Sequence, residues 1–321
     1  MSLSTSATTA RGSATDPAPG RARTTGVGEP NRRSLRHRLA DRGVDRTLVL
    51  LVPALAFVLV LFVYPFGYGL QLSFSPAKGG PFESYRTFFS DPYLRNTIWK
   101  TLGLGLPAAL FNVLVSVPIA YLMRGKIRGK RTLTTLLVVP ITLGTVLTAQ
   151  GLIMYAGPAG WLNKLLTALH ITDQPLPLVH NWTGVFLSLV ITGFPFAFLL
   201  TLSYLSGIDP SLEKAAATLG AGPMQRFRQI TMPLLAPGLA ITFMLSFVLA
   251  FSVFPSAQLV GKPAGQTRVL SIAAYDAAFQ KFDYSLGCAI AIIMAVVMLI
   301  VIGLVMVWRA TLYRGSTGGK G

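Results

Sequence analysis

The chain has 321 residues, of which 52% are hydrophobic and only 12% are charged. A soluble domain carries about a quarter charged residues, so this composition excludes an ordinary soluble domain and predicts a protein that lies mainly in lipid. The net charge of +17 comes from basic residues that lie mostly between long apolar runs, which argues against the polar basic face of a nucleic-acid-binding protein. The single cysteine, Cys288, excludes an internal disulfide framework.

The first 46 residues are rich in Ser, Thr, Ala, Gly, Pro and Arg and have no hydrophobic periodicity. This composition predicts a disordered basic tail, whose cluster from Arg32 to Arg38 is expected to lie against anionic lipid. A secretory signal peptide is not expected, because the first apolar run begins too late and is too long. We therefore expect a membrane domain over 47–313 and a short tail over 314–321.

Six apolar segments follow the tail, each close to the length of about 20 residues that crosses a bilayer as a helix. Helices are expected because a strand exposed to lipid would leave backbone groups unpaired, and the internal prolines are tolerated in membrane helices. The fold class is therefore all-α, with both ends of the membrane domain on the same side. The six predicted segments are 48–72, 97–123, 133–155, 184–206, 235–259 and 285–308.

Aromatic and basic residues orient these segments. Trp99, Trp161, Trp182 and Trp308 fall at or beyond segment ends, as an interfacial aromatic belt requires. If the N-terminus is inside, twenty basic residues lie on the cytoplasmic side and eight lie outside. This asymmetry predicts that both termini lie in the cytoplasm. The membrane is expected to be the cell membrane of a bacterium.

Two of the loops on the predicted outer side are expected to be structured. Residues 158–170 place five apolar side chains on one helical face, which predicts a short helix lying in the outer interface or capping the bundle. The second loop, 261–284, is long and polar enough to form part of an outer vestibule. Asp276 and Asp283 in this loop would face an incoming cation or would simply be solvated.

The cytoplasmic loop 207–233, between the fourth and fifth segments, is the most informative stretch. Asp209 followed by Pro210 predicts a helix start, because aspartate caps the first turn and proline fits the first helical position. Gly220 and Gly222 with Pro223 end this helix, and a second helix follows. Small and apolar residues form one stripe on the first helix, and larger ones lie on one side of the second: Leu212, Ala215, Ala216 and Leu219, then Phe227, Ile230 and Leu234.

This loop resembles the EAA loop of permeases from binding-protein-dependent ABC importers. The resemblance rests on residues at fixed spacing: Ala215, Ala216, Gly220, Ala221, Phe227, Ile230 and Pro233. It implies that the loop is a coupling helix that docks on a separate ATPase, with Glu213, Lys214 and Leu219 also in the contact. Lys214 occupies the position of the family's glutamate, and Glu213 precedes it by one residue.

Within this family the chain looks most like the spermidine/putrescine branch of type I importers, on the strength of three stretches: GWLNKLLTALHITDQP, IDPSLEKAAATLGA and DYSLGCAIAIIM. That resemblance implies a polyamine as the transported solute. Permeases for ferric iron, sulfate and phosphonates share similar sequences, and these solutes and sugars stay open as alternatives. The resemblance also implies three kinds of partner: ABC ATPase subunits, an extracytoplasmic solute-binding protein and a second, related permease, with a homodimer as the alternative to the heterodimer.

The sequence offers no site for chemistry. No phosphate-binding G-x-x-x-x-G-K-[ST] motif occurs, so ATP has to be hydrolysed by another chain. The three histidines are scattered, no metal site or nucleophile–base pair is indicated, and we expect a non-catalytic subunit without a cofactor of its own. A secondary transporter is disfavoured because the predicted spans contain no acidic residue.

The transport path is marked only by polar residues within or near the predicted spans. Such residues often form hydrogen bonds between membrane helices, which is the simpler reading for each of them. Four are candidate path residues: Gln150, Thr192, Ser246 and Gln258. Asn112 and Ser188 are two further polar residues in these segments.

Overall fold

The computed structural model describes residues 46–125 and 129–313, and every regular element in these ranges is helical. Six helical stretches are long and apolar enough to cross a membrane. The predicted all-α membrane fold with six spans is therefore confirmed. The predicted N-terminal tail, except for Arg46, and the C-terminal tail lie outside the described residues.

The long helices are α2 (Arg46–Ser73), α4 (Pro92–Arg124), α5 (Lys130–Ala156), α7 (Trp182–Ser206), α10 (Met232–Phe251) and α13 (Tyr284–Tyr313). The short elements are α3 (Glu83–Ser90), α6 (Trp161–Ala168), α8 (Pro210–Thr218), α9 (Pro223–Arg226), the π-helix η1 (Phe227–Thr231), α11 (Pro255–Leu259), α12 (Leu270–Tyr275) and the π-helix η2 (Asp276–Gln280). The chain falls into two units, 1–62 and 63–321, with α2 crossing the boundary. Within the first unit the described part is helical throughout.

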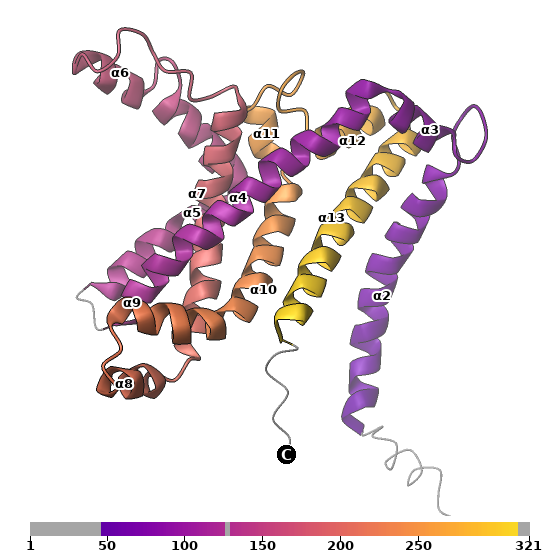
Figure 1. Cartoon of the computed structure of the whole chain (residues 1–321). Helices are drawn as coiled ribbons and strands as arrows, with labels where there is room; N and C mark the ends of the chain where they lie inside the picture. The colour runs from indigo at the N-terminus through magenta and orange to yellow at the C-terminus, as the bar shows by residue number, and fades with distance from the viewer. Residues whose placement is uncertain (1–45, 126–128, 314–321) are drawn as a thin grey trace, which may run out of the picture. The chain divides into compact units, whose positions relative to one another are not determined.

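In the second unit, α4 packs along α7, and α10 packs against both (Figure 1). Aromatic side chains such as Phe198 and Phe247 are fully buried between these helices. Hydroxyl pairs also link helices in the bundle: the Oγ atom of Ser116 lies 2.8 Å from Oγ1 of Thr201 on α7. Because lipid is as apolar as a side chain, such packing and hydrogen bonds are what hold membrane helices together.

Helix α4 begins five residues earlier than the predicted span. Asp91 is its N-cap, with a side chain that accepts a hydrogen bond from the backbone N–H of Tyr93, and Pro92 occupies the first helical position. With 33 residues the helix is about 50 Å long, which exceeds the thickness of the hydrocarbon core. An Asp-Pro pair thus starts α4, as another Asp-Pro pair starts α8. Trp99, expected at the end of a span, lies inside α4.

The fifth predicted span, 235–259, is wrong at both ends. Its helical region begins in the loop before it, and α10 ends at Phe251. A non-helical step follows, and α11 then begins at Pro255. The ring of Pro255 disfavours helical geometry at Phe254, whose φ of −129° and ψ of −58° lie outside the helical range.

Helix α5 is broken near its middle at Gly144, which has φ 69° and ψ 171°. These angles lie in a region that is essentially restricted to glycine, so the helix is interrupted rather than gently bent. Pro140, one turn earlier, cannot donate a backbone hydrogen bond in the same stretch. The continuous helix predicted over 133–155 is therefore two shorter helices joined at this glycine.

The short helix predicted within 158–170 is present as α6. Its apolar residues Trp161 and Leu169 are exposed, whereas the polar Asn163 is buried. The Asn163 side chain donates to the carbonyl oxygen of Gly157 at 2.9 Å and accepts from the backbone N–H of Leu176 at 2.8 Å. This side chain closes the loop between α5 and α7.

The loop 261–284, predicted to form part of a polar outer vestibule, packs on the bundle over part of its length. Residues of α12 such as Leu270 and Ile272 are buried in the core clusters, and α12 and η2 pack on α13. The Oγ1 atom of Thr101 on α4 accepts a hydrogen bond from the backbone N–H of Leu270 at 2.9 Å. The apolar residues within this polar segment are the sequence feature that could have predicted a packed helix here.

Candidate functional site

The loop 207–233 begins with helix α8, and backbone groups at both ends of this helix have hydrogen-bond partners. At the start of α8, the side chain of Asp209 accepts a hydrogen bond from the backbone N–H of Ser211, and this bond holds the pKa of the carboxyl group below its usual value. At the other end, the N–H groups of Gly220 and Ala221 bind the carbonyl oxygens of Ala217 and Ala216. This pair of bonds is a Schellman motif, and the φ of +85° at Gly220 explains why glycine is required there.

An ion pair fixes this helix to the membrane bundle. Nη1 of Arg124, the last residue of α4, lies 2.7 Å from Oε1 of Glu213 on α8, and the two side chains are only 14% and 18% exposed. The same carboxylate accepts a hydrogen bond from Oγ1 of Thr231 in η1, and Nη2 of Arg124 donates to the carbonyl oxygen of Ile208. We call this the Arg124–Glu213 bridge. It joins the end of α4, the start of the loop and the start of the fifth span.

The outward surface of the loop carries large apolar side chains. Leu219 is 89% exposed and Met224 is 74% exposed, and Leu212 is exposed beside them. Lys214, at the position of the family's glutamate, is exposed, whereas Glu213 is drawn inward by the bridge. An apolar surface on a helix that is capped and anchored at its base suits docking to another protein, because little order has to be gained on binding.

The step from the loop into the fifth span is a π-helix. The backbone N–H of Met232 binds the carbonyl oxygen of Phe227, five residues earlier. Pro233 has no N–H and its ring would clash with the carbonyl group four residues earlier in a regular α-helix, so the wider turn relieves the crowding. Phe227 packs edge-on against Tyr121 of α4, with ring centroids 4.8 Å apart. The predicted second helix thus continues directly into α10.

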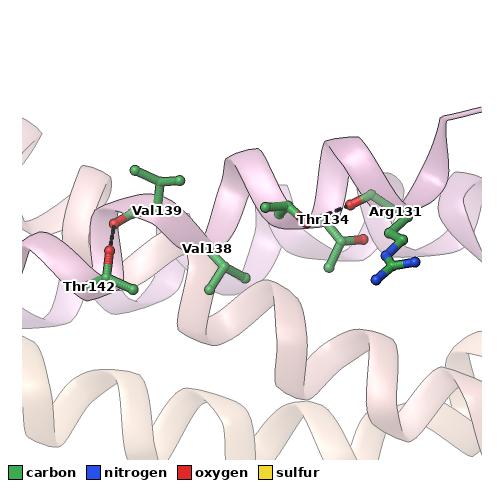
Figure 2. Close-up of a pocket in the computed structure, with 6 residues that line it drawn as sticks. Arg131, Thr134, Val138, Val139 and Thr142 are labelled. Carbon is green, nitrogen blue, oxygen red and sulfur yellow. Dashed lines mark hydrogen bonds between the residues drawn. The ribbon is translucent and has the colours of Figure 1, made fainter.

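One face of α5 is open along its first half. Figure 2 shows Arg131, Thr134, Val138, Val139 and Thr142 along this stretch, which borders a space of about 650 Å³. The Oγ1 atom of Thr142 donates to the carbonyl oxygen of Val139 at 2.7 Å, so the hydrogen-bond partner of this hydroxyl group lies within the same helix. The face is therefore predominantly apolar in character.

A second space, of about 420 Å³, lies between α4, α5, α7, α10 and α11, and we call it the inter-helix cavity. Both interruptions of the long helices border it: Gly144 in α5, and Ser252 and Val253 after α10. Its polar lining comes from side chains on the five helices and on the step after α10: Asn112, Thr145, Thr192, Ser246, Ser252 and Ser256. None of the described residues that line it is charged.

The four candidate path residues lie in different surroundings. Thr192 and Ser246 line the inter-helix cavity. Gln150 is exposed on α5, and Gln258 lies on α11, and neither is among the lining residues. Asn112 and Ser188 form hydrogen bonds between helices, to the carbonyl oxygen of Leu189 and to Oγ of Ser256, as the simpler reading of such residues requires.

The two outer carboxylates serve structural roles. Oδ2 of Asp276 lies 3.0 Å from Nη1 of Arg268, and both side chains are largely buried. Oδ1 of Asp283 accepts the backbone N–H of Leu286 at the start of α13. Arg268 also lies over the ring of Tyr93, 4.8 Å from its centroid. Asp276 is therefore drawn into an ion pair, whereas Asp283 is exposed to solvent, as the simpler of the two expectations requires.

Sequence comparison assigns the family. Residues 34–314 match the family described as binding-protein-dependent transport system inner membrane component. The match spans most of the chain, so this protein belongs to that family of importer permeases. It is a multi-pass inner-membrane protein, and the family implies a separate ATPase subunit.

Several characterised relatives are similar to this chain over most of its length. It is 29% identical to the sn-glycerol-3-phosphate transport system permease protein UgpA of Pectobacterium atrosepticum, over 81% of this chain and 91% of that protein. It is 27% identical to the trehalose/maltose transport system permease protein MalF of Thermococcus litoralis, over 83% and 92%. It is 29% identical to the spermidine/putrescine transport system permease protein PotB of Haemophilus influenzae, over 60% and 70%.

Solved structures share the fold. A chain of a bacterial ABC transporter involved in the import of the acidic polysaccharide alginate matches with a TM-score of 0.70 at 20% identity, over 88% of this chain and 99% of that one. Relatives of this kind are permease subunits, which are generally non-catalytic. The chain is thus an importer permease for a small solute, and its relatives span several solute classes.

Proposed function

We propose that this chain forms part of the path for a small solute through an ATP-driven importer and receives the work of ATP hydrolysis through the loop 207–233. The observation that carries the proposal is the anchored helix α8 with its exposed apolar surface. A force applied to α8 is passed to α4 through the Arg124–Glu213 bridge and to α10 through the continuous helix after Pro223. The loop is therefore built to move together with two of the bundle helices.

We further propose that both termini are cytoplasmic, with α8 on the cytoplasmic side, as the distribution of basic residues predicts. The open apolar face of α5 supports pairing with a second, related permease, and a heterodimer is our preferred assembly. ATP binds to and is hydrolysed by the partner ATPase subunits, so this chain needs no cofactor. An extracytoplasmic binding protein delivers the solute.

The first candidate solute is a polyamine, which the sequence resemblance implies and the similarity to PotB supports. The similarity to the glycerol-3-phosphate and trehalose/maltose permeases supports a second candidate class, sugars and polyol derivatives. Uptake of labelled spermidine, trehalose and sn-glycerol-3-phosphate by vesicles that contain the whole importer separates these candidates.

The coupling role is tested with Leu219→Asp, because this side chain is 89% exposed and its replacement leaves the fold intact. We expect the ATPase to be lost during purification of the complex and ATP-dependent uptake to fall at least tenfold, while membrane insertion is unchanged. The matched control is Leu169→Asp at the end of α6, another exposed leucine far from the loop.

Normal uptake and normal recovery of the ATPase with Leu219→Asp contradict the coupling assignment. Uptake that is abolished by an ionophore but indifferent to loss of the ATPase contradicts the ATP-driven importer and supports a secondary transporter. Equal loss in the Leu169→Asp control shows that a charged residue on any exposed surface is harmful, and this result also removes the support for docking at α8.

A further inference from the structure

We propose that the inter-helix cavity is a binding site on the transport path for an uncharged solute that carries several hydroxyl groups. The inference rests on the proposed function, since a site on the path has meaning only in an importer. Of the two candidate solute classes, it favours uncharged sugars and polyols over the polyamine.

The backbone around the cavity is interrupted in a way that membrane proteins confine to special places. Non-helical backbone within an apolar span is tolerated where it is buried in protein or lines a water-filled space. Here two separate interruptions, at Gly144 in α5 and at Ser252 to Phe254 after α10, both fall within predicted spans, and residues of both line this one cavity. Because two helix breaks border the same cavity, we infer that the cavity has a role in transport.

Two buried polar side chains at the cavity each have an oxygen atom without a hydrogen-bond partner. Asn112 is 1% exposed and Ser246 is 2% exposed, and both line the cavity. The Asn112 amide donates to the carbonyl oxygen of Leu189 at 3.3 Å, but its Oδ1 atom has no hydrogen-bond partner, and neither has Oγ of Ser246. An unsatisfied buried polar atom costs roughly 1–3 kcal/mol, so a ligand that both donates and accepts hydrogen bonds is favoured here.

The charge of the lining selects against ions. A polyamine needs carboxylates or aromatic faces to replace its hydration, and the described lining has no carboxylate and a single aromatic residue, Phe196. An anion needs cationic or multiple N–H donors, and no lysine, arginine or histidine lines the cavity among the described residues. A solute with hydroxyl groups can satisfy Asn112 and Ser246 without bringing a charge out of water.

The other residues that line the cavity also suit an uncharged solute with several hydroxyl groups. Apolar residues such as Pro140, Ile141 and Leu189 alternate with hydroxyl groups from Thr145 and Thr192. A sugar or polyol has carbon-bound hydrogens on its faces and hydroxyl groups at its edges, which match such a mixed wall. The volume of about 420 Å³ falls within the usual range for small-molecule sites, about 300–1,000 Å³.

The test uses the whole importer in vesicles, with trehalose, maltose and glycerol as uncharged probes, spermidine as the cation and sn-glycerol-3-phosphate as the anion. We expect ATP-dependent uptake of at least one uncharged probe. We expect Asn112→Leu and Ser246→Ala to lower that uptake, and Asn112→Leu by about tenfold or more per ATP hydrolysed, because one buried hydrogen bond to the solute is lost.

The matched control is Ser116→Ala, which removes a buried hydroxyl group from α4 about one turn beyond Asn112 and outside the cavity lining. It should lower uptake by less than about twofold while the ATPase stays bound. Equal losses in the control and in Asn112→Leu overturn the site, as does an Asn112→Leu variant with normal uptake.

The two proposals fail in different ways. ATP-dependent uptake confined to spermidine or to sn-glycerol-3-phosphate, or no uptake of any uncharged probe, overturns the inference about the cavity and leaves the coupling role standing. Failure of any ATPase to purify with the intact chain overturns the proposed function itself.

Discussion

The loop 207–233 and the inter-helix cavity satisfy their polar groups in opposite ways. In the loop, the carboxylates of Asp209 and Glu213 have partners within the chain, Glu213 with Arg124 of α4, and the exposed side chains include large apolar ones. In the cavity the wall is mainly apolar, and polar atoms of Asn112 and Ser246 are left unpaired. A protein partner would complete the first region by covering leucine and methionine, and a hydroxylated solute would complete the second by hydrogen bonding.

In the importer that we propose, this contrast assigns motion to the loop and recognition to the cavity. The loop is fixed at its base, so a displacement there reaches α4 and α10 as a whole. The cavity lies where α5 and α10 are interrupted, so a displacement of these helices changes its walls. Four substitutions test the two regions separately, and the first should lower uptake the most.

Breaking the Arg124–Glu213 bridge should have the largest effect. Glu213→Ala leaves the largely buried guanidinium group of Arg124 without its carboxylate, at a cost of about 1–3 kcal/mol in the local stability of the loop. We expect faster hydrogen exchange over 209–231 and at least tenfold lower ATP-dependent uptake. The neighbouring exposed charge offers the control, since Lys214→Ala should leave hydrogen exchange unchanged in the isolated chain. Unchanged exchange in Glu213→Ala would remove the bridge from the account.

Straightening α5 should come next. Gly144→Ala forces an alanine into backbone angles that cost about 1–3 kcal/mol, so the interruption at the cavity should shift or the chain should lose thermal stability. Thermal unfolding in detergent and uptake in vesicles measure the two effects. Gly151→Ala on the same helix has open space at its Cβ position and should be neutral in both assays. Identical behaviour of the two variants would contradict the special role of the break.

Crowding Asn112 should have an intermediate effect. A Cβ atom at Gly193 would lie 2.5 Å from Nδ2 of Asn112, so Gly193→Ala must displace this amide group. We expect uptake to fall by roughly threefold to tenfold, because the hydrogen bond to Leu189 and the orientation of Oδ1 change together. Gly103→Ala on α4, with no atom within 4 Å of its Cβ position, is the comparison. Full activity of Gly193→Ala would mean that the position of Asn112 is immaterial.

The smallest effect concerns the start of α8. The hydrogen bond from Ser211 lowers the pKa of Asp209, so the ionised cap stabilises the helix above the unfolded pKa of this group. That contribution is lost as the pH falls through the lower, folded pKa. Hydrogen exchange at the Ser211 amide should therefore quicken only in acid below the ordinary aspartate range of about 3.9. In Asp209→Asn, which caps without titrating, the acid-dependent step should disappear, and its persistence would assign the step to another group.

Residues that lie close together in the sequence predict much of this architecture. Six apolar runs gave six spans, and the Asp209–Pro210 pair with Gly220 gave the start and end of α8. The same Asp-Pro signal at Asp91 was missed, because the polar residues after it masked the first turn of α4. The break at Gly144 was missed for a related reason: glycine is common in membrane helices, and its φ is set by tertiary packing.

The sequence alone does not predict polar contacts between residues that lie far apart along the chain. Glu213, Arg124 and Thr231 are separated by up to 107 positions, and nothing local pairs them. In the cavity, Thr192 and Ser246 were singled out as polar residues in apolar spans, but their shared position depends on how α7 and α10 pack. Asn112 was noticed for the same reason, and only the structure shows that its oxygen is unpaired.

We propose that Leu219, the C-cap of α8, contacts the ATPase during transport. The sole native cysteine, Cys288, lies in α13, so Leu219→Cys in a Cys288→Ser background gives one reactive thiol on the loop. The account predicts that a short thiol-specific crosslinker joins this position to the ATPase of the assembled importer and that the joined complex stops ATP-dependent uptake. A thiol that reacts freely with small reagents, forms no crosslink to the ATPase and leaves uptake intact would contradict the account.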